Sequence, residues 1–334
     1  MQTLPFLVNR LIWLVPTLFA LVTLMFILTR VIPIDPAIMI AGENASQAQI
    51  EQIRDEFGLR KPLVVQYASY VTALTRGDLG ISLYTQRPIA EELTSRLPAT
   101  IELTFASLLI AALLGTPSGV LAGIYNNTLL DHALRVAAVV GVGLAHFWIA
   151  IQLQLIFSMD LDWFPLSGRV EGMAPQGPTG LLLVDTVLSG DWPQLMSAIQ
   201  HLALPALTIG LPAAAVVQRF TRNSIINNID APFITYQIAM GYSRRKIVWK
   251  YLLRTSLAAT VSLFGLTAGV MLAGVVAVET VFDWPGMGSY AVRSIMYSDY
   301  NAVMGFTLFA GTLFALLSVL VDVLQVIIDP RGVA

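Results

Sequence analysis

Six apolar stretches run along the chain, and each is long enough to cross a membrane as a helix. A hydrocarbon core of roughly 30 Å requires about 20 predominantly apolar residues in a helix. More polar connections separate the stretches, so the pattern predicts an all-α, polytopic membrane protein with about six transmembrane helices. The predicted spans are Leu11–Leu28, Thr100–Ala122, Ala133–Ser158, His201–Phe220 (interrupted by two prolines), Ala258–Phe282 and Met304–Ile328.

The first span should be retained rather than cleaved, because it is long for a signal peptide and no small-x-small site follows it. The most polar segment, 34–98, comes next, and its short periodic patterns predict an extracytoplasmic helical cap. Helices are expected over Ser46–Gly58, Lys61–Thr75 and Pro88–Arg96. The predicted parts are therefore an N-terminal helix (1–33), the cap (34–98) and a core of five spans (99–334).

Composition supports a membrane protein and excludes several kinds of chemistry. Of 334 residues, 56% are hydrophobic and only 12% are charged, whereas a soluble domain has about 25% charged residues. The chain has no cysteine, and its three histidines lack metal-ligand spacing. No GxxxxGK[ST] motif occurs, so we expect neither a metal nor a nucleotide site in this chain.

The distribution of lysine and arginine predicts the orientation. The stretch 219–254 carries seven basic residues, whereas the loops 159–200 and 283–303 carry one each. Basic residues concentrate in short cytoplasmic loops. The loop 221–257 should therefore be cytoplasmic, and with six spans both termini are cytoplasmic too.

The loop at 230–254 has the sequence signals of a folded unit. Asp230 can cap a helix with Pro232 in its first turn, and Gly241 can end that helix in a left-handed conformation. Ser243 can cap a second, basic helix that continues to Arg254. One interpretation is a basic loop that only fixes topology; the pattern around Gly241 favours a compact surface for a soluble partner.

Polar residues within the third span are candidates for function, because lipid makes such groups costly. His146 could relay protons or contact a substrate, although a hydrogen bond to a neighbouring helix is the commoner role. Gln152 and Gln154 could line a polar path or join helices. Both interpretations remain open.

Acidic residues near the ends of the last two spans are further candidates. Glu279, just before Asp283 and Trp284, could shape an outer gate or simply reach the interface. Asp322 is expected to have a structural partner. No catalytic set stands out, and few charges lie near the middle of the spans. Because a secondary carrier usually shows more charges or repeated halves, the energy for transport should come from another subunit.

Eight short stretches in this order resemble one family, the inner-membrane permease subunits of ATP-binding-cassette (ABC) importers for dipeptides, oligopeptides and nickel. The resemblance covers nearly the whole chain and implies the type I importer permease fold. The stretches are IDPAIMIAGE (34–43), FGLRKPLVVQY (57–67), GDLGISL (77–83), RLPATIEL (96–103), FPLSGR (164–169), HLALPALTIGLPAAAVVQRFTR (201–222), ETVFDWPGMGSY (279–290) and IDPR (328–331).

The resemblance also implies that the loop 221–257 contains a coupling helix that inserts into an ATPase subunit. Gly241 matches the family's glycine and Ala239 the small residue before it, but no basic residue stands just before the glycine here. A proline commonly stands at the position of Ala145, so the kink expected there should be absent. The expected coupling residues are Tyr236, Gln237, Ala239, Met240, Gly241 and Tyr242; those expected along the path or gate are His146, Gln152, Glu279, Asp283 and Trp284.

The partners that the resemblance implies are a homologous second permease, two ABC ATPase subunits that bind ATP and Mg, and an extracytoplasmic substrate-binding protein. The chain itself would be a non-enzymatic, pore-forming subunit in the bacterial inner membrane. Dipeptides or oligopeptides are the expected substrates. Nickel, haem, glutathione or antimicrobial peptides are alternatives within the family, and a stand-alone secondary carrier or a membrane-embedded enzyme would belong to another class.

Overall fold

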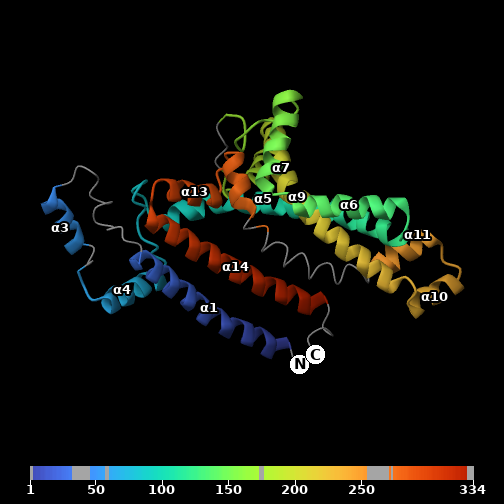
Figure 1. The fold of residues 1–334 in the computed structure, drawn as a ribbon, viewed down its shortest axis with the longest axis horizontal. Coiled ribbons are helices and arrows are strands. Elements are labelled where there is room, and N and C mark those ends of the chain that lie inside the picture. Colours follow the sequence, from blue (N-terminus) through green and yellow to red (C-terminus); the bar gives the residue numbers. More distant parts are fainter. Residues whose placement is uncertain are drawn as a thin grey trace. The chain divides into compact units, whose positions relative to one another are not determined.

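The computed structural model describes residues 3–31, 46–56, 60–172, 177–253, 271 and 274–328, and this part of the chain is almost entirely helical (Figure 1). Residues 274–281 are helical as well. The other helices are α1 (Thr3–Val31), α3 (Gln47–Glu56), α4 (Leu63–Thr75), α5 (Ile89–Ile124), α6 (Leu129–Gly143), α7 (His146–Leu153), the π-helix η1 (Gln154–Asp160), α8 (Leu182–Ser189), α9 (Trp192–Asn228), α10 (Pro232–Ala239), α11 (Arg244–Lys246), the π-helix η2 (Ile247–Leu252), α13 (Met287–Met296) and α14 (Tyr300–Ile328).

Helices α5, α9 and α14 are long and apolar enough to cross a membrane, as the sequence predicts. A fourth span is formed if the bent pair α6 and α7–η1 counts as one. Helix α1 contains a shorter apolar section, Ile12–Leu28, at the place of the first predicted span. Most of the fifth predicted span, Ala258–Phe282, lies outside the described residues.

The third predicted span is not one continuous helix. The chain bends by 104° between α6 and α7. Leu144 and Ala145 both have extended backbone, with ψ of 134° and 136°. This extended pair ends the hydrogen-bond ladder of α6 and starts a new helix at His146. The expectation that the kink is absent without a proline is therefore wrong, and His146 lies at the bend rather than in mid-helix.

The cap region contains two of its three predicted short helices. Helices α3 and α4 lie where the pattern predicts them. The third, Pro88–Arg96, is not separate, because α5 begins at Ile89 and continues through Pro98. Leu93 and Ala99 are buried on either side of this proline. Packing on both sides thus holds the helix together although proline removes one backbone hydrogen bond.

The chain forms two compact units: one comprises 1–7, 97–289 and 316–334, and the other 8–96 and 290–315. The first unit holds the main apolar core, in which Leu103, Ile209 and Trp284 are almost completely buried. In the second unit, Thr23 and Tyr67 share a 2.6 Å hydrogen bond between α1 and α4. This bond and the ring of Phe26, 5.1 Å from that of Tyr67, join those two helices.

Glycines on one face of α5 allow its backbone to contact α9. A Cβ on Gly115 would lie 2.5 Å from the Ala214 carbonyl oxygen, and one on Gly119 would lie 2.6 Å from that of Gln218. Gly123 is equally close to Ile225. Such close approach is the usual way in which helices associate in lipid, where the hydrophobic effect does not drive them together.

Gly119→Leu should lower the free energy of unfolding by about 3 kcal/mol, because the added side chain would have to separate α5 from α9. Thermal unfolding of the detergent-solubilised protein would measure the loss. Gly143→Leu is a matched control, since a Cβ on Gly143 would meet nothing within 4 Å. Equal stability of the two variants would contradict the close packing of these helices.

Candidate functional site

The loop that follows α9 is folded, and its first helix is α10. The predicted helix is present, but Asp230 does not cap it. The N-cap residue is Ala231, whose backbone is extended with ψ of 145°, and Pro232 occupies the first helical turn. The fixed φ of proline suits that position, where a backbone N–H has no helical partner. The start of α10 therefore depends on proline rather than on a capping carboxylate.

Helix α10 ends in a glycine corner, as predicted. Gly241 has a φ of +74°, and its N–H donates to the Ile238 carbonyl at 2.9 Å. The Tyr242 N–H donates to the Gln237 carbonyl at 3.2 Å. These two bonds form a Schellman motif, which requires a left-handed residue at the position of Gly241. Nothing lies within 4 Å of a Cβ on Gly241, so the requirement is one of backbone conformation.

The second helix of the loop is basic, as predicted, but its geometry is unusual. Ser243 is the N-cap residue of α11, yet its side chain makes no capping hydrogen bond. Helix α11 passes directly into the π-helix η2. Lys246 places its Nζ 4.1 Å from the centre of the Tyr242 ring, so a cation–π contact joins the two sides of the corner. Arg254 lies outside the described residues.

A small apolar cluster, here called the bracing cluster, fixes the loop to the ends of the long helices. Helix α10 contributes one buried side chain to it, and α5, α9 and η2 contribute the others. Burial of such side chains removes apolar area from water and holds short helices that would be unstable alone. The bracing cluster consists of Val120, Ile225, Ile234, Ile247, Val248 and Leu252.

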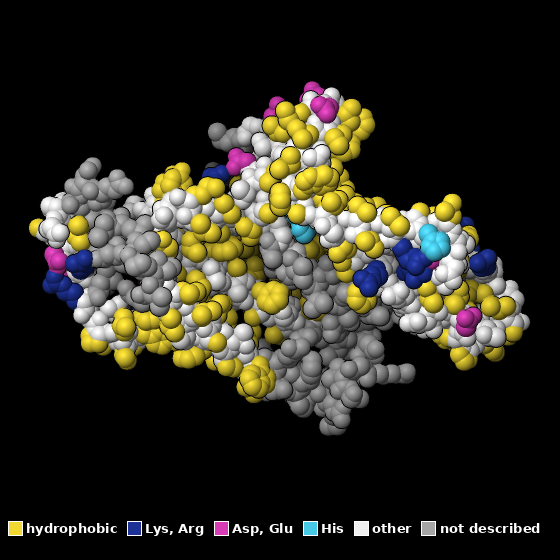
Figure 2. All heavy atoms as spheres, in the orientation of Figure 1, with side chains coloured by type: hydrophobic (Ala, Val, Ile, Leu, Met, Phe, Trp, Pro, Cys, Tyr) yellow, Lys and Arg dark blue, Asp and Glu magenta, His cyan; other side chains and the backbone are white. Residues whose placement is uncertain are grey.

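Large apolar side chains of α10 remain exposed and form what we call the docking surface. The exposed fractions are 40% for Phe233, 61% for Tyr236, 61% for Ile238 and 59% for Met240. An exposed group of this kind typically marks a contact surface for another molecule. Within the unit that holds α6, α10 and α11, Lys and Arg side chains lie over these helices (Figure 2).

The docking surface shares Tyr236 and Met240 with the coupling residues expected from the sequence. Tyr236, Met240 and Tyr242 are exposed, whereas Gln237 is half-buried. Phe233 and Ile238 are exposed too, although the family pattern did not single them out. A signal for Phe233 exists, because 233, 236 and 240 lie three and four residues apart and therefore on one face of a helix.

A second group of predicted residues forms a buried polar network. Glu279 has an exposed fraction of 0%. Its Oε1 accepts a hydrogen bond from the Thr100 hydroxyl at 2.6 Å, and its Oε2 accepts from the backbone N–H groups of Gly288 (2.7 Å) and Ser289 (3.0 Å). The carboxylate thus binds the start of α13, where helical N–H groups lack partners. The Glu279 side chain is therefore enclosed by protein.

Trp284 is part of the same buried region. Its indole N–H donates to the Ala99 carbonyl at 3.0 Å, and its side chain is almost fully buried. Asp283, in contrast, is exposed and has a left-handed backbone with φ of +48°. Helix α5 is therefore joined to the 279–289 segment by both Thr100 and Ala99. Of the predicted gate residues, only Glu279 and Trp284 come together here.

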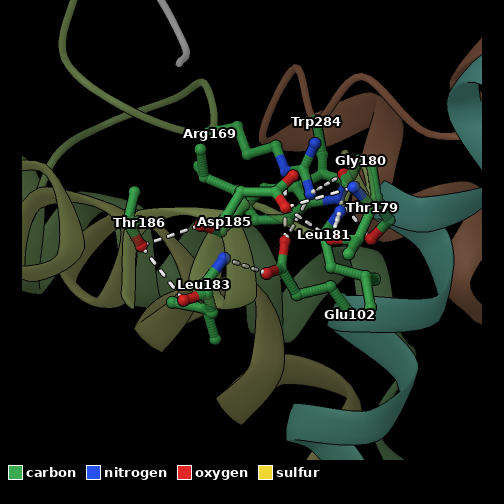
Figure 3. A network of polar contacts seen from close by, with 11 residues as sticks. Glu102, Arg169, Thr179, Gly180, Leu181, Leu183, Asp185, Thr186 and Trp284 are labelled. Atoms are coloured by element: carbon green, nitrogen blue, oxygen red, sulfur yellow. Dashed lines mark hydrogen bonds and ion pairs between the residues drawn. The ribbon is translucent and has the colours of Figure 1, made fainter. Parts of the chain in front are cut away.

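A third network lies beside Trp284 and was not predicted (Figure 3). Glu102 on α5 accepts two hydrogen bonds from Arg169, at 2.6 and 3.1 Å, and one from the Leu183 N–H at 2.6 Å. Arg169 also donates to the Gly180 carbonyl and lies 5.9 Å from the Trp284 ring. A sequence signal for this network existed: Glu102 is a lone acidic residue at the start of an apolar span, and Arg169 is the only basic residue of the loop 159–200.

The polar residues of the third span serve different purposes. His146 is the first residue of α7 and packs over Gly274, 3.3 Å from the position of a Cβ there. The Gln154 side chain donates to the carbonyls of Leu166 (2.8 Å) and Val281 (3.2 Å), so it joins separate segments. Gln152 is half-buried. Asp322 lies on α14, and its side chain falls outside the described part of the chain.

No group of three metal-binding side chains occurs among the described residues. Long apolar helices, a folded loop after α9 and buried polar contacts near α13 are features of a polytopic membrane protein. The sequence belongs to a family with those properties, the inner membrane components of binding-protein-dependent transport systems. Residues 115–332 match the model of that family, and residues 3–104 match the model of its N-terminal region.

Characterised relatives are similar over almost their full length. A probable D,D-dipeptide transport system permease protein of Escherichia coli (strain K12) is 40% identical over 92% of this chain and 91% of its own. The dipeptide transport system permease protein of Alkalihalophilus pseudofirmus is 35% identical over 98% and 99%. A glutathione transport system permease protein of Escherichia coli is 34% identical over 98% of both chains. The chain is thus a transport permease and not itself a catalyst.

A solved structure of an ABC transporter is similar in fold to this chain. The MetNI methionine ABC transporter in an inward-facing conformation has a chain that matches with a TM-score of 0.51 and 18% identity. The match covers 72% of this chain and 96% of that one. It confirms the predicted all-α permease fold of an ABC importer.

Proposed function

We propose that this chain forms one half of the translocation path of an ATP-driven importer for dipeptides or oligopeptides. The observation that carries the proposal is the folded loop, in which a braced short helix presents an apolar docking surface. The substrate class is supported by relatives named as dipeptide permeases, two of which are 40% and 35% identical to this chain. Glutathione, a short peptide itself, is the second candidate, because a glutathione permease is 34% identical.

The partner at the docking surface would be an ABC ATPase subunit, which binds ATP and Mg. The exposed Phe233, Tyr236 and Met240 require a largely apolar cleft on that subunit. Exposed Arg244 and Arg245 beside it favour acidic residues at the rim of the cleft. A homologous second permease and a second ATPase complete the proposed complex.

The loop 221–257 and both termini would lie in the cytoplasm, and the cap, 34–98, outside the inner membrane. Basic residues concentrated in the 219–254 stretch support this orientation. The cap would help to receive a substrate-binding protein. His146 and Gln152 are proposed to lie along the path. Glu279, Asp283 and Trp284 are proposed at its outer gate, where buried hydrogen bonds would keep the gate in shape.

The mechanism would be alternating access. ATP binding closes the two ATPase subunits on each other, and the folded loop 229–253, here called the docking loop, carries that movement into the spans. A stiff element is required for such transfer, because a flexible loop would absorb the displacement. The bracing cluster and the Schellman corner provide the stiffness. Substrate choice would rest mainly with the binding protein, so the path requires no sharp recognition site.

Purification of the complex in mild detergent tests the proposal. A second permease, one or two P-loop ATPases and ATP-dependent uptake of a labelled dipeptide into liposomes are the expected results. Transport by this chain alone, driven by an ion gradient, would instead identify a secondary carrier. Binding of metal by the complex without peptide uptake would favour nickel as the substrate.

Deletion of Gln47 to Leu59, which contains α3, should weaken docking of the binding protein without preventing membrane insertion. The reason is that this short helix belongs to the proposed cap and to none of the long apolar helices. Binding of the purified substrate-binding protein to reconstituted permease would measure the effect. Unchanged binding would refute the role of this helix.

A further inference from the structure

A buried ion pair joins α6 to α9 near the docking loop. Arg222 donates from its Nε to Asp131 Oδ1 at 2.6 Å and from an Nη to Oδ2 at 2.8 Å. The Asn127 N–H donates to the same carboxylate at 2.9 Å. This bidentate geometry is specific to the planar guanidinium group, and lysine cannot reproduce it.

Asp131 has a special place in α6. It is the only residue of that helix that is buried, and it lies in the first turn. Much of the helix surface is exposed and apolar, including Val136 and Val139. Helix α6 packs along α9, and the Asp131 carboxylate is the buried polar contact that fixes its first turn there.

The arginine lies beside the bracing cluster. Arg222 precedes Ile225, a member of the bracing cluster, by one helical turn on α9. A Cβ on Gly123 of α5 would be 2.6 Å from Ile225 and 3.2 Å from the Arg222 carbonyl. The ends of α5 and α9 are thus packed together with the docking loop, and the ion pair adds α6 to this assembly.

We propose that Asp131 and Arg222 are a positioning pair that makes α6 move together with the docking loop. The inference rests on the proposed coupling to an ATPase, and it names the two residues that would transmit the coupling movement to α6. Helix α6 leads through the 104° bend to α7 and η1, where Gln154 holds the carbonyls of Leu166 and Val281. A displacement of the docking loop would then reach the hydrogen bonds of Gln154 through α6 as well as through α9.

Two substitutions test the pair. Asp131→Asn removes the charge at nearly constant shape, and Arg222→Lys keeps the charge but loses the bidentate geometry. Arg135→Gln is the matched control, because Arg135 reaches the same carboxylate (3.5 Å) from within α6 and, among the described residues, pairs with no second helix. The measured quantity is radiolabelled dialanine transported per ATP hydrolysed by the reconstituted complex.

We expect both substitutions to lower that ratio by about tenfold, with the ATPase still bound, and the control to stay within about twofold of the parent. A purely structural pair would lower the yield of the complex and leave the ratio unchanged, which would overturn the proposal. Absence of ATP-dependent transport by the parent complex would overturn the proposed function itself, and this result is distinct from loss in the variants alone.

A distance measurement decides the question if the variants do not assemble with the ATPase. The chain has no cysteine, so Val136→Cys on α6 and Asn227→Cys at the end of α9 accept spin labels selectively. Double electron–electron resonance in detergent should give a narrow distribution of the distance between the two labels in the parent and a broader one in Asp131→Asn. A narrow distribution in both proteins would overturn the inference.

Discussion

Gly241→Pro should abolish transport while the chain still inserts into the membrane. Proline cannot adopt the φ of +74° found at this position, and it lacks the N–H that donates to the Ile238 carbonyl. A strained backbone of this kind costs about 2 kcal/mol, which lowers the population of the native corner conformation roughly 30-fold. Because the exposed side chains of α10 depend on that corner, uptake should be lost although ATP hydrolysis continues. Peptide uptake and ATP hydrolysis, measured on the same liposomes, give the comparison.

Gly190→Pro is the matched control for this prediction. Gly190 also ends a helix, α8, in a left-handed conformation with φ of +71°, and its N–H donates to the Val187 carbonyl. It lies in the loop 159–199, which in the proposed orientation is on the other side of the membrane from Gly241. The control should lose some stability but keep its ratio of transport to hydrolysis. Normal uptake by the Gly241 variant would show that the corner has no role in coupling.

Glu279→Ala should lower the free energy of unfolding by about 4 kcal/mol. The substitution leaves the Thr100 hydroxyl and the N–H groups of Gly288 and Ser289 without their acceptor, and unpaired buried donors cost about 1–3 kcal/mol each. Gly286 and Gly288 pack directly on the carboxylate, because a Cβ on either would collide with it. The site is thus built around this one side chain. Thermal unfolding in detergent measures the loss.

Asp162→Asn serves as the control, because Asp162 is an exposed carboxylate of the same unit, and its left-handed backbone, with φ of +52°, is one that asparagine tolerates. Its stability should equal that of the parent. A Glu279→Ala protein as stable as the parent, but with altered transport, would show that Glu279 acts as a gate rather than as a structural joint.

Features encoded by local sequence could be predicted. The long apolar helices follow from hydropathy alone, and the glycine corner at Gly241 follows from the preference of a left-handed position for glycine. Each of these predictions rests on one residue type whose conformational or steric properties hardly depend on distant residues.

Features that depend on distant partners could not be predicted. Proline at 98 suggested the end of a helix, but packing of Leu93 and Ala99 overrides that signal. The bend at Leu144 and Ala145 contains no proline, and Gly143 just before it is still helical. Glu279 meets Thr100 across 179 residues, and Arg222 meets Asp131 across 91. No periodic pattern reveals such pairs, because their spacing is set by the packing of whole helices.

The central claim, that α10 docks into an ATPase subunit, can be tested by site-specific cross-linking. The cysteine-free chain allows a single photoreactive label at Tyr236→Cys, in native membranes, with Trp192→Cys as an exposed control at the start of α9. The account predicts that the label at 236 cross-links to a P-loop ATPase, identified by mass spectrometry, and that the label at 192 does not. An ATPase cross-linked from 192 and never from 236 would contradict it.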